Sequence, residues 1–430
     1  MALLLDLTPL RASPSFRRLW WGLGIANLGN QLTLVAVGLQ VYAISGSTLS
    51  VGILGVCALV PLIALGLYGG ALVDAYDRRT VALLSAVGLF VTTAALAVQG
   101  WLHVNALVLL YVLVALQSAA FAINNPARTA IIPRLLKASL LPAANVLTTT
   151  AWSAALVLGP LVGAALVAAS GFAAAYTVDM IMFTAGLWAL WRLPPLPPLP
   201  PEENLDHPER KRGLAAVLEG LRYLATRSNV RMTFVVDLIA MIFAMPRVLL
   251  PAAGVVFLGG GATTTGLLTA AFAVGAVLAG LFSGGLVGAR WQARLICLAI
   301  TIYGLSVAAF GMVLIVVGPN SPSAVLVPAL IGAMSFLAIA GGSDAVSAVF
   351  RQTILQTATP DSMRGRLQGV FIVVVAGGPR LGDLVLGAGA SWLNEGLAAL
   401  VGGLSCVTLL SVVTLTQRRF LAYDAGNPTP

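Results

Sequence analysis

The sequence predicts an all-α membrane protein with twelve transmembrane helices, arranged as two six-helix repeats with both termini in the cytoplasm. Hydrophobic residues make up 59% of the 430 positions and charged residues only 9%, against about 25% charged residues in an ordinary soluble domain. So few charges cannot cover the surface of a soluble fold. A disordered chain is excluded as well, because such chains are poor in the Leu, Val and Ile that are abundant here.

The helix count comes from the spacing of the apolar blocks. A helix that crosses the ~30 Å hydrocarbon core needs about 20 residues. Twelve blocks of that length begin near residues 19, 49, 80, 105, 146, 171, 232, 264, 294, 324, 367 and 396.

The positive charges predict the orientation. With the N-terminus inside, 22 of the 24 Lys and Arg residues fall in cytoplasmic segments, and the other two, Arg247 and Arg380, fall inside predicted spans. Cytoplasmic segments of membrane proteins carry such an excess of positive charge. This bias explains the net charge of +9 without a nucleic-acid partner.

Several kinds of chemistry lack the residues they need. The two lysines, Lys137 and Lys211, do not follow a glycine, so a nucleotide-binding GxxxxGK[ST] loop is absent. The three cysteines lie far apart without a CxxC pair, and both histidines lie in polar connections. We therefore predict neither an enzyme nor a metal or cofactor site, and we expect an ion gradient to supply the energy.

The composition changes between the sixth and seventh spans. Residues 192–212 read RLPPLPPLPPEENLDHPERKR, and apolar residues then recur at helical spacing from Leu214 to Leu224, as in an amphipathic helix on a membrane surface. The sequence thus predicts bundles at 1–195 and 231–417, a cytoplasmic linker at 196–230 and a tail at 418–430. The linker is either a passive tether or part of a gate.

The two halves of the chain resemble each other at three corresponding places. Gly159-Pro160-Leu-Val-Gly163 matches Gly378-Pro379-Arg-Leu-Gly382, and Arg128-Thr-Ala-Ile-Ile is similar to Arg351-Gln-Thr-Ile-Leu. The segment 70–79 in the first half likewise corresponds to 284–294 in the second. Duplicated six-helix units are common in secondary transporters, which bind their substrate near the middle of the membrane.

Two motifs and the linker identify a family resemblance. The segment 70–79 resembles the loop 2–3 signature G-x-x-x-D-R-x-G-R-R of the major facilitator superfamily, with matches at Asp74, Arg78 and Arg79. Gly159-Pro160-x-x-Gly163 resembles the helix 5 motif of its antiporter branches. The Pro-rich linker and the segments 245–247 and 360–366 are similar to the enterobactin-exporter-type subgroup of efflux proteins.

The resemblance implies roles for these motifs. Asp74 would meet the N-terminus of the eleventh helix, and Gly70, Arg78 and Arg79 would complete a gate; the alternative is that the arginines only set orientation. Gly159, Pro160 and Gly163 would make the fifth helix bendable and closely packed, which suits exchange with protons. Ordinary helix packing is the alternative explanation.

Charged residues inside predicted spans are costly and indicate function. They are Asp179, Asp237, Arg247, Asp344, Arg380 and Asp383. Because Arg380 and Asp383 are i, i+3 neighbours, we expect them to pair, with Arg247 joining them from the adjacent helix that the family fold implies. The network is either a static set of ion pairs or a sensor for a proton or anionic substrate. As proton carriers Asp237 and Asp344 rank first, whereas for Asp179 a hydrogen bond within the N-terminal bundle is favoured.

Polar residues in the first and fourth spans are candidates for lining a substrate cavity. They are Asn27, Asn30, Gln31, Gln117, Asn124 and Asn125. Relatives often carry an acid as Gly-Asp where this chain has Gly29-Asn30, so proton coupling at the first helix would have to use another residue. Packing hydrogen bonds between helices are the alternative role.

Together these features predict a monomeric, multi-pass secondary transporter of a bacterial inner membrane. It would export a small organic molecule, a siderophore or a drug, against inward proton flow by alternating access. Import of a nutrient or metabolite by the same fold is the competing hypothesis, and Na⁺ remains an alternative coupling ion. A non-transporting signalling or scaffold relative is a third class, which the cavity polar residues and the gate motif argue against.

Overall fold

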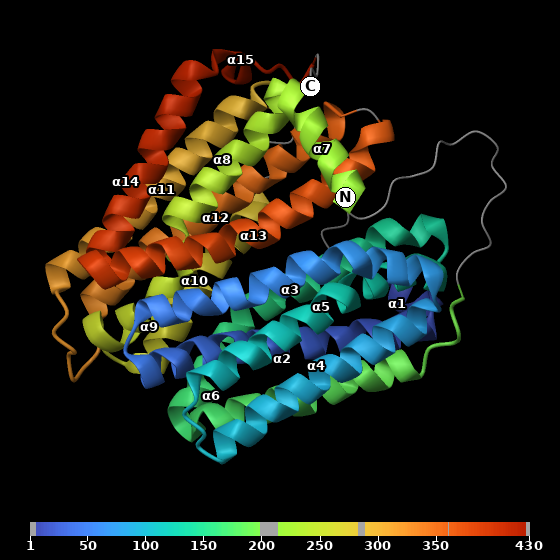
Figure 1. Cartoon of the computed structure of the whole chain (residues 1–430), viewed down its shortest axis with the longest axis horizontal. Helices are drawn as coiled ribbons and strands as arrows, with labels where there is room; N and C mark the ends of the chain where they lie inside the picture. The colour runs from blue at the N-terminus through green and yellow to red at the C-terminus, as the bar shows by residue number, and fades with distance from the viewer. Residues whose placement is uncertain (1–5, 198–213, 283–288, 360, 427–430) are drawn as a thin grey trace. The chain divides into compact units, whose positions relative to one another are not determined.

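The computed structural model describes residues 6–197, 214–282, 289–359 and 361–426. Within these ranges all regular structure is helical and no strand occurs (Figure 1), which confirms the all-α prediction. Ten of the described segments are long and apolar enough to cross a membrane. The chain is therefore a multi-pass membrane protein.

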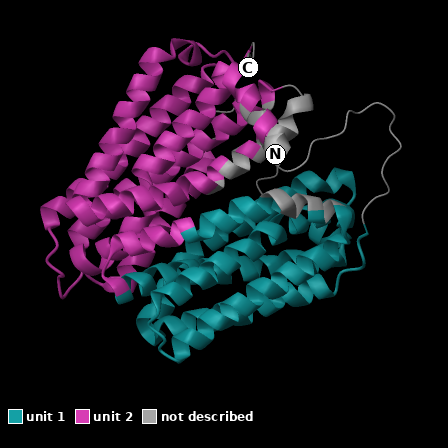
Figure 2. Cartoon of the chain, viewed as in Figure 1, with its two compact units in different colours: residues 1–44, 57–213 teal, residues 45–56, 214–430 magenta. Residues whose placement is uncertain are grey.

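The chain divides into two compact units (Figure 2): unit 1 comprises residues 1–44 and 57–213, and unit 2 comprises residues 45–56 and 214–430. The helices that begin in the first half of the chain are α1 (Thr8–Ala12), α2 (Pro14–Ser45), α3 (Thr48–Ala75), α4 (Arg78–Trp101), α5 (Leu107–Leu135), the 3-10 turn η1 (Ala138–Leu140) and α6 (Leu141–Trp191). The core of unit 1 includes Leu19 of α2, Leu89 of α4, Ile131 of α5 and Phe183 of α6.

The described residues from Leu214 onward form eleven elements. They are α7 (Leu214–Thr226), α8 (Ser228–Ala244), η2 (Pro246–Leu249), α9 (Leu250–Ala252), the π-helix η3 (Ala253–Phe257), α10 (Gly261–Phe282), α11 (Gln292–Val317), α12 (Val327–Thr357), α13 (Asp361–Leu393), α14 (Glu395–Thr416) and α15 (Arg418–Leu421). The helix predicted within the linker 196–230 is present as α7.

The helices follow the predicted apolar blocks with two differences from the expected count. Helix α6 has 51 residues and covers the two blocks predicted near 146 and 171. At Gly171 its backbone is not helical, with φ 79° and ψ 177°, a conformation that glycine adopts without a steric cost. Helix α13, with 33 residues, covers the block predicted near 367 and is not among the ten segments.

Proline breaks the helix that begins at Ser228. Helix α8 ends at Ala244 because Pro246 has no backbone N–H to continue it. The chain then passes through 3-10, α and π turns to Phe257. The Tyr303 hydroxyl of α11 donates a hydrogen bond of 2.9 Å to the carbonyl of Ala244, so the backbone oxygen released by the break is satisfied. The break places Arg247 in the 3-10 turn η2, directly after Pro246.

Small residues bring the first turns of α3 onto unit 2. A methyl group at Gly52 would overlap the carbonyl of Asp383, and Thr48 donates a hydrogen bond of 2.6 Å to Glu395. Residues 45–56 therefore cluster with unit 2, whereas the sequence placed them in the bundle 1–195. Glycine permits such close approach between helices.

The C-terminal segment is held to unit 2 by both apolar and charged contacts. Phe420 and Tyr423 are buried, and Arg290 forms an ion pair of 2.7 Å with Asp424. The hydrogen bond from Arg290 lowers the pKa of the Asp424 carboxyl below its usual value.

Candidate functional site

Three charged side chains form a buried cluster in unit 2. Arg351 of α12 makes an ion pair with Asp237 of α8, and the side chains are 6% and 4% exposed. A second Arg351 nitrogen lies 3.5 Å from the Asp344 carboxylate, whose side chain is 26% exposed. Two carboxylates thus share one guanidinium, and the fully ionised cluster carries a net charge of −1. We call these three residues the charge triad.

A separate ion pair of unit 2 corrects the predicted pairing in α13. Asp383 pairs with Arg247, which follows the break after α8, as expected for two neighbouring helices. The expected pair between Arg380 and Asp383 is wrong, because among the described residues Arg380 forms no ion pair. Asp383 is 5% exposed and its Oδ2 lies beside Gly55 of α3, whereas the Arg247 side chain is 38% exposed.

Asp179 of α6 lies in the core of unit 1 and is 1% exposed. The Thr33 hydroxyl donates a hydrogen bond of 2.5 Å to its Oδ2, while its Oδ1 has no hydrogen-bond partner among the described residues. A methyl group at Gly29 would overlap this oxygen. The favoured hypothesis, a hydrogen bond within the N-terminal bundle, agrees with this geometry.

The helix 5 motif forms a close contact between α6 and α2. A methyl group at Gly159 would overlap Cβ of Gln31, and one at Gly163 would lie 2.9 Å from Cα of Leu32. Gly159, Pro160 and Gly163 are all buried. The motif therefore has a packing role, and its part in ion exchange stays a prediction.

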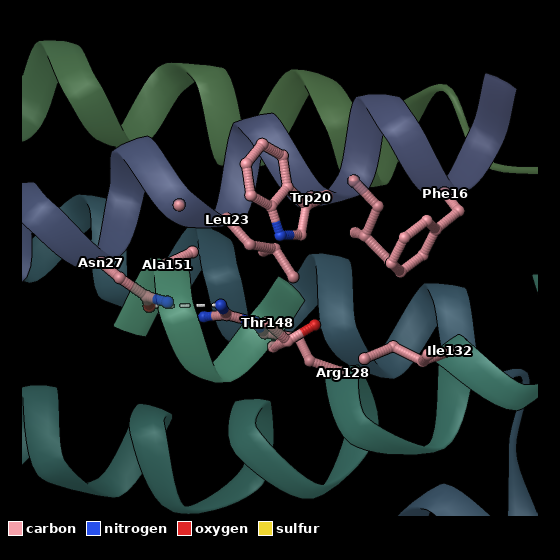
Figure 3. A pocket seen from close by; sticks show the side chains of 10 residues that line it. Phe16, Trp20, Leu23, Asn27, Arg128, Ile132, Thr148 and Ala151 are labelled. Atoms are coloured by element: carbon pink, nitrogen blue, oxygen red, sulfur yellow. Dashed lines mark hydrogen bonds between the residues drawn. The ribbon is translucent and has the colours of Figure 1, made fainter. Parts of the chain in front are cut away.

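A cavity of about 380 Å³ opens in unit 1 between α2, α5 and α6. Its lining residues are Leu23, Asn27, Phe121, Asn125, Arg128, Thr129, Ile132, Thr148, Thr149 and Trp152. A narrower recess shares five of these residues and continues to Phe16, Leu19 and Trp20 (Figure 3). We call the two together the unit 1 cavity.

The cavity contains one charged side chain, that of Arg128. Its guanidinium donates hydrogen bonds of 3.2 Å to Oδ1 of Asn27 and 3.4 Å to Oδ1 of Asn124. Asn124 in turn donates to the Ala82 carbonyl and the Ser85 hydroxyl, which fixes the orientation of its amide.

The predicted cavity residues have different surroundings. Asn27 and Asn125 line the unit 1 cavity, whereas Asn30, Gln31, Gln117 and Asn124 are not among its lining residues. Gln31 packs against Gly159 and Gln117 donates to Thr93 at 3.3 Å. Packing between helices therefore accounts for several of the polar residues that were candidates for substrate contact.

The gate motif is described only in part. The side chains of Gly70 and Asp74 fall outside the described residues. Arg79 donates a hydrogen bond of 2.6 Å to the Trp191 carbonyl, and Arg78 donates one of 3.4 Å to the carbonyl of Ala130. These arginines therefore contact the end of α6 and α5 within unit 1.

Asp77, between the two motif arginines and Asp74, ties the start of the linker to unit 1. Its carboxylate caps α4 through the Thr80 amide at 2.8 Å and accepts a hydrogen bond from the Leu196 amide. Leu193 and Leu196 are buried. Residues 193–197 thus belong to the packed surface of unit 1.

Sequence reasoning missed two residues of these clusters: Arg128 was counted as a cytoplasmic orientation charge, and Trp20 was not considered. Arg351 was counted among the cytoplasmic charges too, but its seven-residue spacing from Asp344 predicted that both lie on one helix face, and the two side chains do make contact. For Arg128 the signal was its correspondence to Arg351 in the internal repeat. Within the described ranges no group of three or more His, Cys, Asp and Glu residues comes together as a metal site.

Comparison with known proteins supplies the family. A family model described as "transmembrane secretion effector", of the major facilitator type, matches residues 5–429. Proteins named enterobactin exporter EntS from Shigella boydii and Escherichia coli are each 28% identical over 421 residues, which are 97% of this chain and 96% of theirs.

Solved transporter structures share the fold. The nucleoside transporter NupG has a TM-score of 0.72 at 12% identity and covers 93% of this chain and 98% of its own. A bacterial homologue of the iron transporter ferroportin has a TM-score of 0.68 at 15% identity, with coverages of 94% and 98%. The molecule is thus a membrane transporter and not an enzyme, and the chain belongs to the transmembrane secretion effector family of the major facilitator superfamily.

Proposed function

We propose that this transporter is a proton-coupled exporter of small organic molecules that works by alternating access in a bacterial inner membrane. The EntS proteins that it resembles are named as exporters. The substrate class we propose is a siderophore or an amphiphilic drug. The sequence contains no nucleotide-binding loop, which favours an ion gradient as the energy source.

The proposal includes twelve spans with both termini in the cytoplasm. The α6 segment Ala138–Trp191 has 54 residues, more than twice the ~20 residues of one crossing, and Gly171 divides it. Counting α6 as two crossings and adding α13 to the ten segments gives twelve. An even number places both ends of the chain on the same side, and the positive charges favour the cytoplasm.

The observation that carries proton coupling is the charge triad. One guanidinium cannot neutralise two carboxylates, and an unpaired charge in a buried cluster is costly. Protonation of one carboxylate brings the triad to zero net charge. Asp344 is the better proton carrier of the two because its side chain is 26% exposed, against 4% for Asp237, so water reaches it more readily.

The remaining candidate residues receive supporting roles in this proposal. Asp74, with Gly70, Arg78 and Arg79, belongs to the gate. Arg247 and Asp383 hold α13 against the break after α8.

The test is transport in proteoliposomes that contain a pH-sensitive dye, with a catecholate siderophore and a cationic amphiphilic drug as probes. We expect an imposed proton gradient to drive accumulation of one probe, and a protonophore to abolish it. Asp344→Asn should abolish coupling, while Asp424→Asn, outside the spans, serves as the matched control.

Three results would decide against parts of the proposal. Accumulation driven by a sodium gradient alone would make Na⁺ the coupling ion. Movement of a nutrient in the direction of uptake, in right-side-out vesicles, would favour import. That hypothesis is compatible with the fold, which nucleoside transporters share. Full coupling in Asp344→Asn would remove this residue from the proton path.

A further inference from the structure

We propose that the unit 1 cavity binds the anionic oxygen group of an aromatic ligand, with Arg128 as the charged anchor and the Trp20 indole as a second donor. The inference rests on the proposed export function only for the source of that ligand. It assigns a binding subsite, which can be measured without any transport.

Arg128 has no acidic partner in the part of the chain that the structure describes. The ion pairs found there involve Arg247, Arg290 and Arg351, whereas the acceptors of Arg128 are two neutral amides. A guanidinium that lines a cavity without a carboxylate attracts an anion, because charge-assisted hydrogen bonds are roughly twice as strong as neutral ones.

The internal repeat makes this difference informative. Arg128 and Arg351 occupy corresponding positions of the two halves. In unit 2 the arginine faces Asp237 and Asp344, while in unit 1 it faces Asn27 and Asn124. Asparagine is close to aspartate in shape but carries no charge. Unit 1 therefore keeps the geometry of an arginine site and leaves the positive charge available to a ligand.

A second donor of the same cavity also lacks an acceptor. The indole nitrogen of Trp20 is buried, and no described residue accepts its N–H. Buried donors are paired in most native structures, and an unpaired one costs about 1–3 kcal/mol. Figure 3 shows Trp20 on α2 and Arg128 on α5 at the same recess, with the indole nitrogen turned toward the α5 side. One ligand oxygen group between them would satisfy both donors.

The rest of the lining indicates the body of the ligand. Phe121, Trp152 and Leu23 contribute apolar and aromatic surface, and Thr149 a hydroxyl-bearing side chain. The volume of about 380 Å³ lies at the lower end of the roughly 300–1,000 Å³ of small-molecule sites. A compact aromatic carboxylate or phenolate matches this size and chemistry.

The position of the cavity suits entry from the cytoplasm. Phe16 lies near the start of α2, Thr148 near the start of α6 and Ile132 near the end of α5. In the proposed topology this end of unit 1 is cytoplasmic, where an exporter takes up its substrate. The same oxygen chemistry is present in an anionic lipid headgroup, so both sources must be tested.

The test measures binding of radiolabelled salicylate, an aromatic carboxylate, to the full chain in phosphatidylcholine nanodiscs. Salicylamide is the neutral probe of the same shape. We expect salicylate binding to fall about 10-fold or more in Arg128→Gln, the loss of a charge-assisted contact, and to survive in Arg128→Lys. Trp20→Phe, which keeps a ring but removes the N–H, should weaken binding several-fold.

Asn27→Asp is the sharpest variant, because it retains Arg128 and supplies the carboxylate that unit 2 already has. It should suppress salicylate binding while the helical circular dichroism stays unchanged, even if Arg128→Gln fails to fold. Arg17→Gln is the matched control, since Arg17 is exposed on α2 and lies outside the cavity lining.

The outcomes separate the possibilities. Competition with salicylate by phosphatidylglycerol in wild type identifies a lipid headgroup as the anion, and salicylate binding that this lipid does not change identifies a soluble ligand. Equal binding of salicylate and salicylamide, or unchanged salicylate binding in Asn27→Asp, would overturn the subsite. A failure of proton-driven transport with intact salicylate binding would count against the proposed function alone.

Discussion

The charge triad makes a quantitative prediction about stability. Arg351→Gln removes the one cation that faces two carboxylates. Because the Arg351 and Asp237 side chains are 6% and 4% exposed, water cannot replace the lost partner. Removing one member of a buried ion pair costs about 3–5 kcal/mol. The Asp344 carboxylate, 3.5 Å away, contributes less, because its side chain is 26% exposed and water can replace the guanidinium there.

We expect Arg351→Gln to lower the free energy of unfolding by about 3–5 kcal/mol, measured by titrating SDS into mixed micelles and following circular dichroism. The double variant Asp237→Asn, Arg351→Gln leaves only the more exposed carboxylate, which can take up a proton. Its loss of unfolding free energy should be about 1–3 kcal/mol smaller than the sum of the losses in the two single variants. Arg290→Gln, at an exposed pair with Asp424, is the control and should leave the unfolding curve unchanged.

If the two single losses add in the double variant, Asp237 and Arg351 do not interact, because additive changes indicate independent sites. An unfolding curve of Arg351→Gln like that of the exposed control would also contradict the prediction.

Three shorter predictions follow from other contacts. Gly159→Ala should destabilise the protein by about 1–3 kcal/mol through overpacking, whereas Gly66→Ala, with no heavy atom within 4 Å of its added methyl group, should be neutral in the same SDS titration. The hydrogen bond from Arg290 lowers the pKa of Asp424 in the folded protein, so its contribution is present above the unfolded pKa of about 3.9 and is lost as pH falls through the folded value. Limited proteolysis next to Asp424 should therefore become faster at low pH, and Asp424→Asn should show the faster cleavage already at pH 7, while the buried Phe420 keeps the rest of the segment packed. Asp77→Ala removes the cap of α4, worth about 1 kcal/mol, and should speed hydrogen exchange both there and at the start of the linker.

Helical membrane architecture could be predicted because the bilayer imposes it: every backbone polar group in the hydrocarbon must be paired within the chain, and about 20 apolar residues are needed per crossing. The continuation of α6 through Gly171 and the end of α8 at Ala244 were harder to predict from the sequence. Hydropathy measures transfer into lipid, and it carries little information about the backbone conformation at a single glycine or after a single proline.

Within the site, spacing identified charges but not their partners. The i, i+3 rule paired Arg380 with Asp383, because it considers one helix at a time. In the structure Asp383 pairs with Arg247, which lies in the 3-10 turn η2 just after Pro246. A tertiary partner of this kind is invisible to periodicity. Spacing did connect Asp344 with Arg351, since both lie on α12.

The internal repeat was predicted from three weak matches. At one of them, that of Arg128 with Arg351, the residues around the arginine differ in charge between the two halves. In unit 2 the repeated arginine is surrounded by carboxylates, so a proton is the smallest species that can change the charge of its cluster. In unit 1 the corresponding Arg128 is held by Asn27 and Asn124, so the species that can neutralise it is an anion. We therefore propose that proton chemistry and anion binding lie in different halves of one duplicated unit. The two functions should therefore separate by mutation. Asp344→Asn should abolish proton coupling and leave salicylate binding intact, whereas Asn27→Asp should suppress salicylate binding and leave proton coupling intact. Loss of both activities in either variant would mean that one site serves both purposes.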